Sequence, residues 1–238
     1  MLSPFYFTTQ RKRIIMNLLS RKNLLIYNYN HSLLEHLEVD KKLVTYCETN
    51  TLITRFWMSD GVVLGKLDKT LSGFDEGIKF LKDNKLDYGI RKSGGLAVYL
   101  DSGVLNISFI FNNNRCTLLE GYEIVVELLK DFLKCYHIVF DVGEISDSYC
   151  PGKYDLSVSK RKFCGMAQFR SSETSVVMIT LFVSGDQRKR SRIINEFYIN
   201  SNYEKSKMFP QINADSMITL NELTEFNLNP DKIKKDFI

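Results

Sequence analysis

The sequence predicts an α+β fold in which a mixed, mainly antiparallel β-sheet is flanked by helices. Residues 104–111 alternate between apolar and polar side chains, as a strand with one buried face does. Residues 174–183 are rich in β-branched side chains, which favour a second long strand. Thr117 and Glu120 have the spacing of a capping box, and apolar residues follow at helical intervals to about residue 134. Long strands and a strongly amphipathic helix in one stretch of chain indicate a sheet with helices packed on it.

The N-terminal part of the chain predicts an amphipathic helix over residues 30–46, where leucines recur at near-helical spacing. We expect His31 and His36, on or near this helix, to be surface or capping histidines. No repeat, linker or low-complexity block divides the chain. We therefore expect residues 1–29 to be an N-terminal extension and residues 30–238 to form one domain that ends in helices.

The next segments alternate between strand and helix. Residues 55–65 predict two short strands around an Asp-Gly turn, with Trp57 in the core. Residues 74–84 present a helical apolar face, and a strand is expected to run into Ile90. In the strand over residues 104–111, one face is expected to be core and the other to be available to line a site.

The C-terminal half predicts a hairpin and further helices. Residues 154–158 and 163–170 are expected to pair around a turn at residues 159–161. Residues 136–140 are strand-like, so we expect His137 to be a core or edge residue. Beyond Gly185, the sequence predicts a basic helix over residues 188–198 and a capped helix that starts at residues 219–222.

Composition excludes several classes of protein. The 238 residues are 44% hydrophobic, which is enough for a full core and argues against disorder. The 32 basic and 28 acidic residues nearly cancel, so the net charge of +4 suits an acidic protein partner without requiring a nucleic acid. Five cysteines without CxxC spacing argue against a disulfide framework and a metal site.

The start of the chain resembles a signal peptide only briefly. A basic cluster at residues 11–13 precedes an apolar run that Asn17 interrupts and residues 21–22 close. This run is too short to export or anchor the protein, so we expect a cytoplasmic protein with no membrane partner. Met16 is an alternative start of translation.

Cys150 is the candidate nucleophile. It precedes Pro151-Gly152 in a polar, turn-forming segment, so we expect it on an exposed loop. A thiol with an ordinary pKa near 8.5 is only about 3% thiolate at pH 7, so catalysis requires a neighbouring cation. We expect Lys162 to supply it, because the hairpin brings the two residues to one end of the sheet. A buried, inert cysteine and a solvated turn lysine are the alternatives.

A second candidate feature is the loop at residues 91–95, Arg-Lys-Ser-Gly-Gly. Paired glycines let a ligand or another backbone approach closely. A tight turn is the alternative interpretation.

Three segments together resemble the biotin/lipoate protein ligase and octanoyltransferase superfamily. Residues 91–108, RKSGGLAVYLDSGVLNIS, resemble its first signature, and residues 162–170, KFCGMAQFR, resemble its second. Residues 148–157, SYCPGKYDLS, resemble the branch of octanoyl-[glycine cleavage H protein]:protein octanoyltransferases, the lipoyl amidotransferases. The resemblance spans residues 55–185 and implies the catalytic-domain fold of that superfamily. Ligases usually have a third glycine and a His-Asp pair where this chain has Leu96 and Leu100-Asp101, which speaks against acyl-adenylate chemistry.

The resemblance also implies a reaction. Cys150 would take an octanoyl or lipoyl group from a lysine of glycine cleavage H protein, hold it as a thioester, and pass it to lysines of the lipoyl domains of 2-oxoacid dehydrogenase acyltransferase subunits. Lys162 would favour the thiolate and polarise the acyl carbonyl. No cofactor or metal is implied. The expected substrate-binding residues are Arg91, Ser93, Gly94, Gly95, Asn106, Ser108 and Gly165.

Three alternatives stay open on sequence alone. An octanoyltransferase that draws from acyl carrier protein would have the same fold and the same thiol. An ATP-dependent lipoate ligase would not need Cys150. A non-catalytic carrier-binding protein would have an inert thiol.

Overall fold

A large β-sheet lies at the centre of the fold. The computed structural model describes residues 22–28, 32–49, 51–112, 116–203 and 209–237. Strand β1 pairs parallel with β2, and all the remaining strand pairs in this sheet are antiparallel. This confirms the predicted mixed, mainly antiparallel sheet. The strand order is β1 (Lys22–Asn28), β2 (Thr51–Trp57), β6 (Val104–Asn112), β10 (Thr174–Phe182), β9 (Arg161–Arg170), β8 (Leu156–Val158) and β7 (Asp141–Val142).

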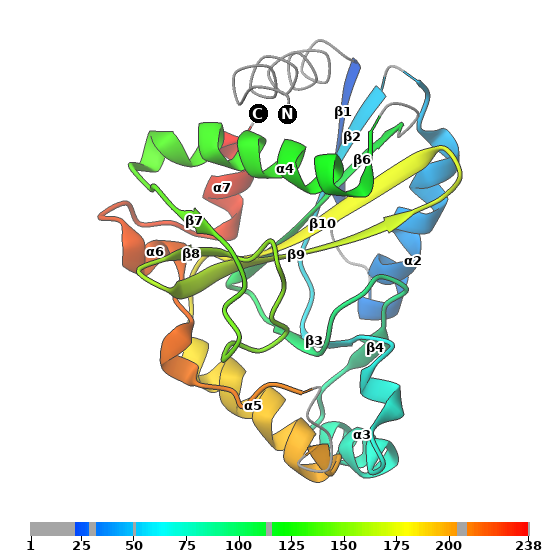
Figure 1. Cartoon of the computed structure of the whole chain (residues 1–238), viewed down its shortest axis with the longest axis vertical. Coiled ribbons are helices and arrows are strands. Elements are labelled where there is room, and N and C mark those ends of the chain that lie inside the picture. The colour runs from blue at the N-terminus through cyan, green and yellow to red at the C-terminus, as the bar shows by residue number, and fades with distance from the viewer. Residues whose placement is uncertain (1–21, 29–31, 50, 113–115, 204–208, 238) are drawn as a thin grey trace, which may run out of the picture.

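A smaller sheet lies below the large one (Figure 1). Its strands run in the order β4 (Tyr88–Ile90), β3 (Gly61–Leu64) and β5 (Val98–Leu100). The predicted Asp-Gly turn joins β2 to β3, but these strands belong to different sheets. Gly61 has a φ of +126°, and a Cβ there would lie 2.4 Å from the carbonyl oxygen of Asp87. The turn therefore passes the chain from the large sheet to the small one.

Helix α4 (Leu118–Leu133) covers one face of the large sheet (Figure 1). Both halves of the predicted capping box form, between Thr117 and Glu120. The buried face of α4 packs on the alternating apolar residues of β6, and Leu220 and Ile233 join this core from two C-terminal helices. These are α6 (Leu220–Leu223) and α7 (Pro230–Asp236).

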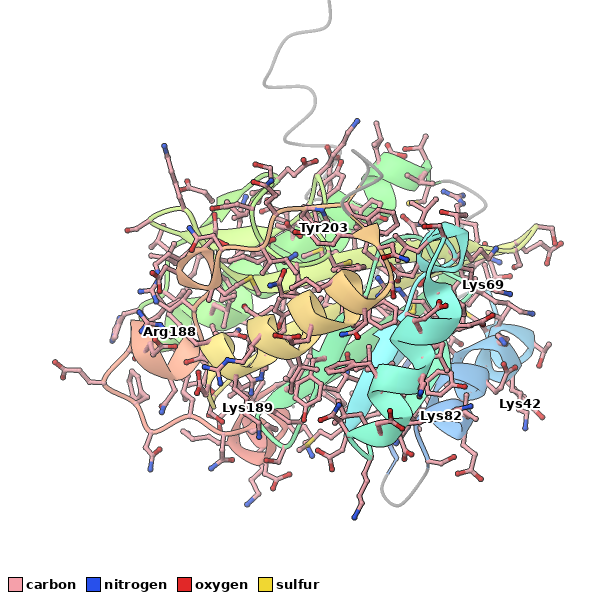
Figure 2. All side chains as sticks on the ribbon, turned by 90° about the horizontal axis from the view of Figure 1, so that it is seen from below. Lys42, Lys69, Lys82, Arg188, Lys189 and Tyr203 are labelled. Atoms are coloured by element: carbon pink, nitrogen blue, oxygen red, sulfur yellow. The ribbon has the colours of Figure 1, made fainter. Side chains whose placement is uncertain are left out.

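The other face of the large sheet is covered by α2 and by the small sheet with α3 and α5. Figure 2 shows α3 and α5 side by side, with Lys82 and Lys189 pointing away from the protein. Gly77 of α3 allows this contact, because a Cβ there would lie 1.9 Å from Oγ of Ser201. The helices are α2 (Leu33–Leu43), α3 (Phe74–Asp83) and α5 (Gln187–Asn200), with 3-10 turns η1 (Val44–Tyr46), η2 (Asp68–Thr70), η3 (Lys134–Tyr136) and η5 (Ala214–Ser216).

The prediction that His36 is a surface or capping residue is wrong. Its side chain is buried on α2, where it stacks on Trp57 and lies 2.7 Å from a guanidinium nitrogen of Arg55. Arg55 is also buried and pairs with Asp40 at 2.8 Å. The sequence pattern could not show this, because the partners come from a helix and a strand. His31 lies outside the described residues.

The strand-like assignment of residues 136–140 is also wrong. The chain turns there after η3, and His137 is exposed with a left-handed φ of +58°. Tyr136 and Ile138 are nevertheless buried. Their alternation arises because two residues flanking the turn pack on the core, not because they form a strand.

The remaining predicted elements are confirmed. The hairpin of β8 and β9 turns at Ser159 and Lys160, both of which have positive φ. Residues 22–28 of the expected N-terminal extension add strand β1 to the large sheet. Within the described residues, no helix is long and apolar enough to cross a membrane.

Candidate active site

Cys150 lies in the loop between β7 and β8 and has a φ of +50°, a left-handed conformation that non-glycine residues rarely adopt. The preceding Tyr149 is fully buried and anchors this loop. Its ring packs edge-on against Phe182 at 5.6 Å, and its hydroxyl donates to Oε1 of Gln187 at 3.3 Å. The strained backbone is therefore fixed by buried contacts, which leave the partly exposed thiol in a defined place.

The thiol of Cys150 accepts two N–H donors from the loop between β4 and β5. The backbone N–H of Leu96 lies 3.1 Å from Sγ, and Nη2 of Arg91 lies 3.2 Å from it. The same Nη2 donates to the carbonyl oxygen of Leu96 at 3.0 Å. A cation and a backbone dipole directed at sulfur both stabilise a thiolate. This is the geometry that a nucleophilic thiol requires.

Gly95 makes this approach possible. Its φ is +98°, and a Cβ there would lie 2.3 Å from Nη2 of Arg91 and 3.0 Å from Sγ of Cys150. Gly94 differs, because a Cβ at that position would meet nothing within 4 Å. Of the two predicted glycines, only Gly95 is required by the contacts of the thiol.

Lys162 and Asp155 form a buried ion pair behind Cys150, with Nζ 3.1 Å from Oδ1. Lys162 also donates to the carbonyl oxygens of Cys150 at 2.7 Å and Tyr149 at 3.2 Å. Asp155 accepts the backbone N–H of Gly152 at 3.0 Å. Burial raises the pKa of Asp155, and the charge of Lys162 offsets part of this rise. The pair holds the nucleophile loop from both ends.

The structure therefore gives the two basic residues of the site different contacts from those expected. We expected Lys162 to be the cation next to the thiol, but its hydrogen bonds go to the backbone of the loop. Arg91, expected to bind substrate, donates to the sulfur. Gly165 lies beside the lysine, where a Cβ would be 3.3 Å from Cε and 3.4 Å from Nζ.

The other four thiols lie in different surroundings. The sulfur atoms of Cys47, Cys116, Cys135 and Cys164 each lie within hydrogen-bonding distance of a backbone carbonyl oxygen, an arrangement that favours the neutral S–H form. Burial also raises the pKa of Cys164, which is fully buried, and of Cys135. Cys150 thus differs from them in the direction of its hydrogen bonds.

Three further predicted residues lie away from the thiol or are engaged elsewhere. Ser108 donates to Oδ2 of Asp40 at 2.6 Å, so its hydroxyl is used inside the protein. Asn106 accepts a hydrogen bond from Thr180, which pairs with Gly165 in the sheet. Ser93 is buried in the loop that carries Arg91. Substrate contacts for these residues stay predictions.

Sequence reasoning missed Asp155 and the N–H of Leu96. Asp155 was part of a recognised motif, but nothing in its spacing marks it as the partner of Lys162. A backbone donor such as that of Leu96 leaves no trace in residue identity. No group of three His, Cys, Asp or Glu within the described part of the chain is placed to hold a metal ion.

Comparisons with known proteins identify the family of the chain. A family model described as the lipoyl protein ligase A/B catalytic domain matches residues 32–238. The chain is 40% identical over 181 residues to a lipoyl-[GcvH]:protein N-lipoyltransferase of Listeria monocytogenes, covering 74% of this chain and 65% of that protein. It is 40% identical over 186 residues to an octanoyl-[GcvH]:protein N-octanoyltransferase of Geobacillus kaustophilus, covering 76% and 66%. The match spans just under two thirds of the length of both relatives.

Solved structures are similar in fold. A lipoate-protein ligase A bound with ATP aligns with a TM-score of 0.71 at 18% identity, covering 92% of this chain and 82% of that one. A bipartite lipoate protein ligase from Thermoplasma acidophilum aligns with a TM-score of 0.67 at 16% identity, covering 91% and 80%. The expected biotin/lipoate ligase type of catalytic fold is confirmed.

Replacement of Arg91 tests which cation stabilises the thiolate. Arg91→Met removes the positive charge that stabilises a thiolate at the sulfur, so we expect alkylation of Cys150 by iodoacetamide at pH 7 to slow by about tenfold. The measurement is the pH dependence of the alkylation rate, followed on the Cys150 peptide by mass spectrometry. Lys92→Met, on the exposed neighbouring residue, is the control and should leave the profile unchanged. An unchanged profile in Arg91→Met would contradict the assignment.

The two glycines provide a second test. Gly95→Ala forces a Cβ into Arg91 and the thiol, so we expect a lower melting temperature and a changed alkylation rate at Cys150. Gly94→Ala adds the same methyl group in open space and should change neither. Equal behaviour of the two variants would show that the close approach at Gly95 is unimportant.

The buried pair predicts a non-additive effect on stability. Lys162→Met leaves Asp155 buried without its cation, and we expect the free energy of unfolding to fall by about 3–5 kcal/mol. Lys162→Met/Asp155→Leu removes both charges and should recover much of this loss. Urea unfolding measures both variants, with exposed Lys153→Met as the control. A double variant no more stable than the single one would show that the two charges are not coupled.

Proposed function

The chain belongs to the lipoyl protein ligase A/B catalytic domain family, and we propose that it is an acyltransferase that works through a thioester on Cys150. It moves an octanoyl or lipoyl group from a lysine of glycine cleavage H protein to lysines of the lipoyl domains of 2-oxoacid dehydrogenase acyltransferase subunits. One observation supports this above all others. Two N–H donors, from Arg91 and Leu96, are directed at the thiol, which is what a nucleophilic cysteine requires.

The first half-reaction makes the thioester. The thiolate of Cys150 attacks the carbonyl carbon of the octanoyl amide, a C–S bond forms, and the C–N bond to the donor lysine breaks. The departing amine takes up a proton from solvent and leaves as the free lysine of H protein. Arg91 stabilises the thiolate before the attack, and the N–H of Leu96 lies where it can also donate to the oxyanion.

The second half-reaction reverses these steps on another protein. The neutral amine of the acceptor lysine attacks the thioester, the C–S bond breaks, the new amide nitrogen releases a proton to solvent, and the thiolate of Cys150 returns. The amide bond broken and the amide bond formed are of the same kind, so the overall transfer needs no external source of free energy. An ATP-independent transfer is therefore chemically complete with the residues of this site.

The departures from the ligase pattern support the same choice. Leu96 stands where ligases usually have a third glycine, and here its side chain is buried in the core. Asp101, which ligases precede with a histidine, follows Leu100 here and binds Nε of Arg190 at 3.0 Å. Both positions serve the nucleophile or the fold, so we favour transfer through a thiol over acyl-adenylate formation.

The carriers and the acyl group are proposals by similarity. The names of the Listeria monocytogenes and Geobacillus kaustophilus relatives both specify GcvH, but one specifies lipoyl transfer and the other octanoyl transfer. We propose GcvH as the donor and octanoyl as the main acyl group, with lipoyl also accepted. We propose that the reaction takes place in the cytoplasm.

A transfer assay tests the proposal. The chain is incubated with octanoyl-H protein or octanoyl-acyl carrier protein, together with an unmodified lipoyl domain, and all proteins are followed by intact mass. We expect transfer from octanoyl-H protein without ATP, and an octanoyl adduct on the chain that is absent from Cys150→Ala. Cys135→Ala, which removes an exposed thiol elsewhere, should keep full activity.

Each alternative has its own outcome in this assay. Transfer only from acyl carrier protein would overturn the donor. Activity of Cys150→Ala that requires ATP and free octanoate would indicate a ligase. A chain that binds octanoyl-H protein without adduct or transfer would be a carrier-binding protein.

A further inference from the structure

A buried carboxylate lies beneath the loop that contacts the thiol. Asp68, the first residue of η2, is fully buried, and its Oδ2 accepts the backbone N–H of Gly65 at 2.7 Å. Its Oδ1 accepts the hydroxyl of Tyr198 at 3.0 Å. Within the described chain, no cation forms an ion pair with Asp68. A buried carboxylate without a paired cation is costly, so a residue kept only for packing would be apolar.

Tyr198 connects this carboxylate to the catalytic loop. It lies on the buried face of α5, and its hydroxyl accepts the backbone N–H of Ala97 at 3.0 Å. Burial raises the pKa of Tyr198 well above its ordinary value, so the hydroxyl stays protonated and donates a hydrogen bond to Asp68. Because an ionised Asp68 only accepts, the hydroxyl directs its proton at Asp68 and a lone pair at Ala97.

The other end of the same loop segment rests on the same cluster. A Cβ on Gly65 would lie 1.8 Å from the carbonyl oxygen of Gly95, so the two backbones are in direct contact. Gly65 and Tyr198 thus fix Gly95 and Ala97. Leu96, whose N–H contacts the thiol, lies between these two fixed residues.

We propose that Asp68 and Tyr198 are positioning residues for the nucleophile: their hydrogen-bonded link fixes the segment from Gly95 to Ala97, and this holds the N–H of Leu96 against Cys150. The inference rests on the proposed role of Cys150 as the acyl carrier. Neither Asp68 nor Tyr198 is within hydrogen-bonding distance of the thiol in the described contacts. They act through Leu96.

The charges around Asp68 agree with this role. Burial raises the pKa of Asp68, and the hydrogen bonds from Gly65 and Tyr198 and the charge of Arg91 offset part of this rise. The resulting pKa is about 6. The groups that face it are therefore Tyr198 from α5 and Arg91 from the loop, with Cys150 close enough to influence Tyr198. At neutral pH the carboxylate stays ionised and keeps the hydroxyl of Tyr198 oriented.

Tyr198→Phe tests the link with a minimal change. It removes the acceptor of the Ala97 N–H and so loosens the N–H of Leu96 at the sulfur; we expect alkylation of Cys150 by iodoacetamide at pH 7 to slow by about tenfold. In the acyl-transfer assay, kcat should fall while KM changes little. Tyr203→Phe is the matched control, because the ring centroid of Tyr203 lies 6.1 Å from that of Tyr198 and its hydroxyl forms no hydrogen bond with any described residue. It should leave the alkylation profile unchanged.

A purely structural role gives a different result. Tyr198→Phe would then lower the melting temperature but leave the alkylation profile of folded protein unchanged, and the proposal would be overturned. If Tyr198→Phe does not fold, Asp68→Asn replaces it, with hydrogen–deuterium exchange as the readout. We expect faster exchange of the amides of Leu96 and Ala97, and unchanged exchange would also overturn the proposal.

The experiment separates this inference from the proposed function. Alkylation and hydrogen exchange need no acyl donor, so they report on the thiol even if octanoyl transfer fails. Transfer without an effect of Tyr198→Phe on the thiol would sustain the function and reject the link. An effect of Tyr198→Phe on the thiol without any octanoyl transfer would support the link and reject the proposed function.

Discussion

The buried pair of Lys162 and Asp155 is the interaction on which the geometry of the site depends. Cys150 sits in a left-handed conformation, which costs free energy that the surrounding contacts must offset. Lys162 binds the carbonyl oxygens of the two residues at the bend, and Asp155 binds the N–H of Gly152 beyond it. Both charged groups are nearly inaccessible to water, so their hydrogen bonds are strong and directional. The position of the sulfur is thereby set by the hydrogen bonds to the backbone around Cys150.

With the backbone held in this way, the electrostatics of the sulfur are left to a different part of the chain. Arg91 and the N–H of Leu96 come from the loop that joins the two outer strands of the small sheet. A division of this kind lets each cation make short contacts suited to its shape. The compact ammonium of Lys162 fits between converging carbonyl oxygens, and the planar guanidinium of Arg91 bridges sulfur and a carbonyl oxygen.

The two-sheet architecture explains why these parts meet. The large sheet supplies Lys162 from β9 and supports the loop of Cys150, while the small sheet supplies the loop of Arg91. Glycines at the closest approaches, Gly65 and Gly95, allow backbone to contact backbone and sulfur where any side chain would collide. The distance between the thiol and its two donors, Arg91 and the N–H of Leu96, is thus set by the packing of one sheet on the other. Such packing holds the groups more rigidly than a flexible surface loop does.

The sequence by itself determined the local elements and the candidate residues of the site. Capping boxes at Thr117 and Thr219 and the alternation in β6 depend on neighbours within a few residues, so the pattern predicts them. Cys150, Lys162 and Arg91 were found because their motifs are contiguous. Residues 136–140 were misassigned because two residues that flank a turn and pack on the core mimic a strand.

Only the tertiary structure decided which cation contacts the sulfur. Arg91 is 59 residues from Cys150 along the chain and Lys162 is 12; sequence proximity favoured Lys162, whereas the side-chain hydrogen bond to the sulfur comes from Arg91. The same holds for His36 and Asp155, whose partners lie on other elements. Charge contacts at this range depend on where whole strands and loops are placed by core packing. The periodicity of the residues that form them does not encode that placement.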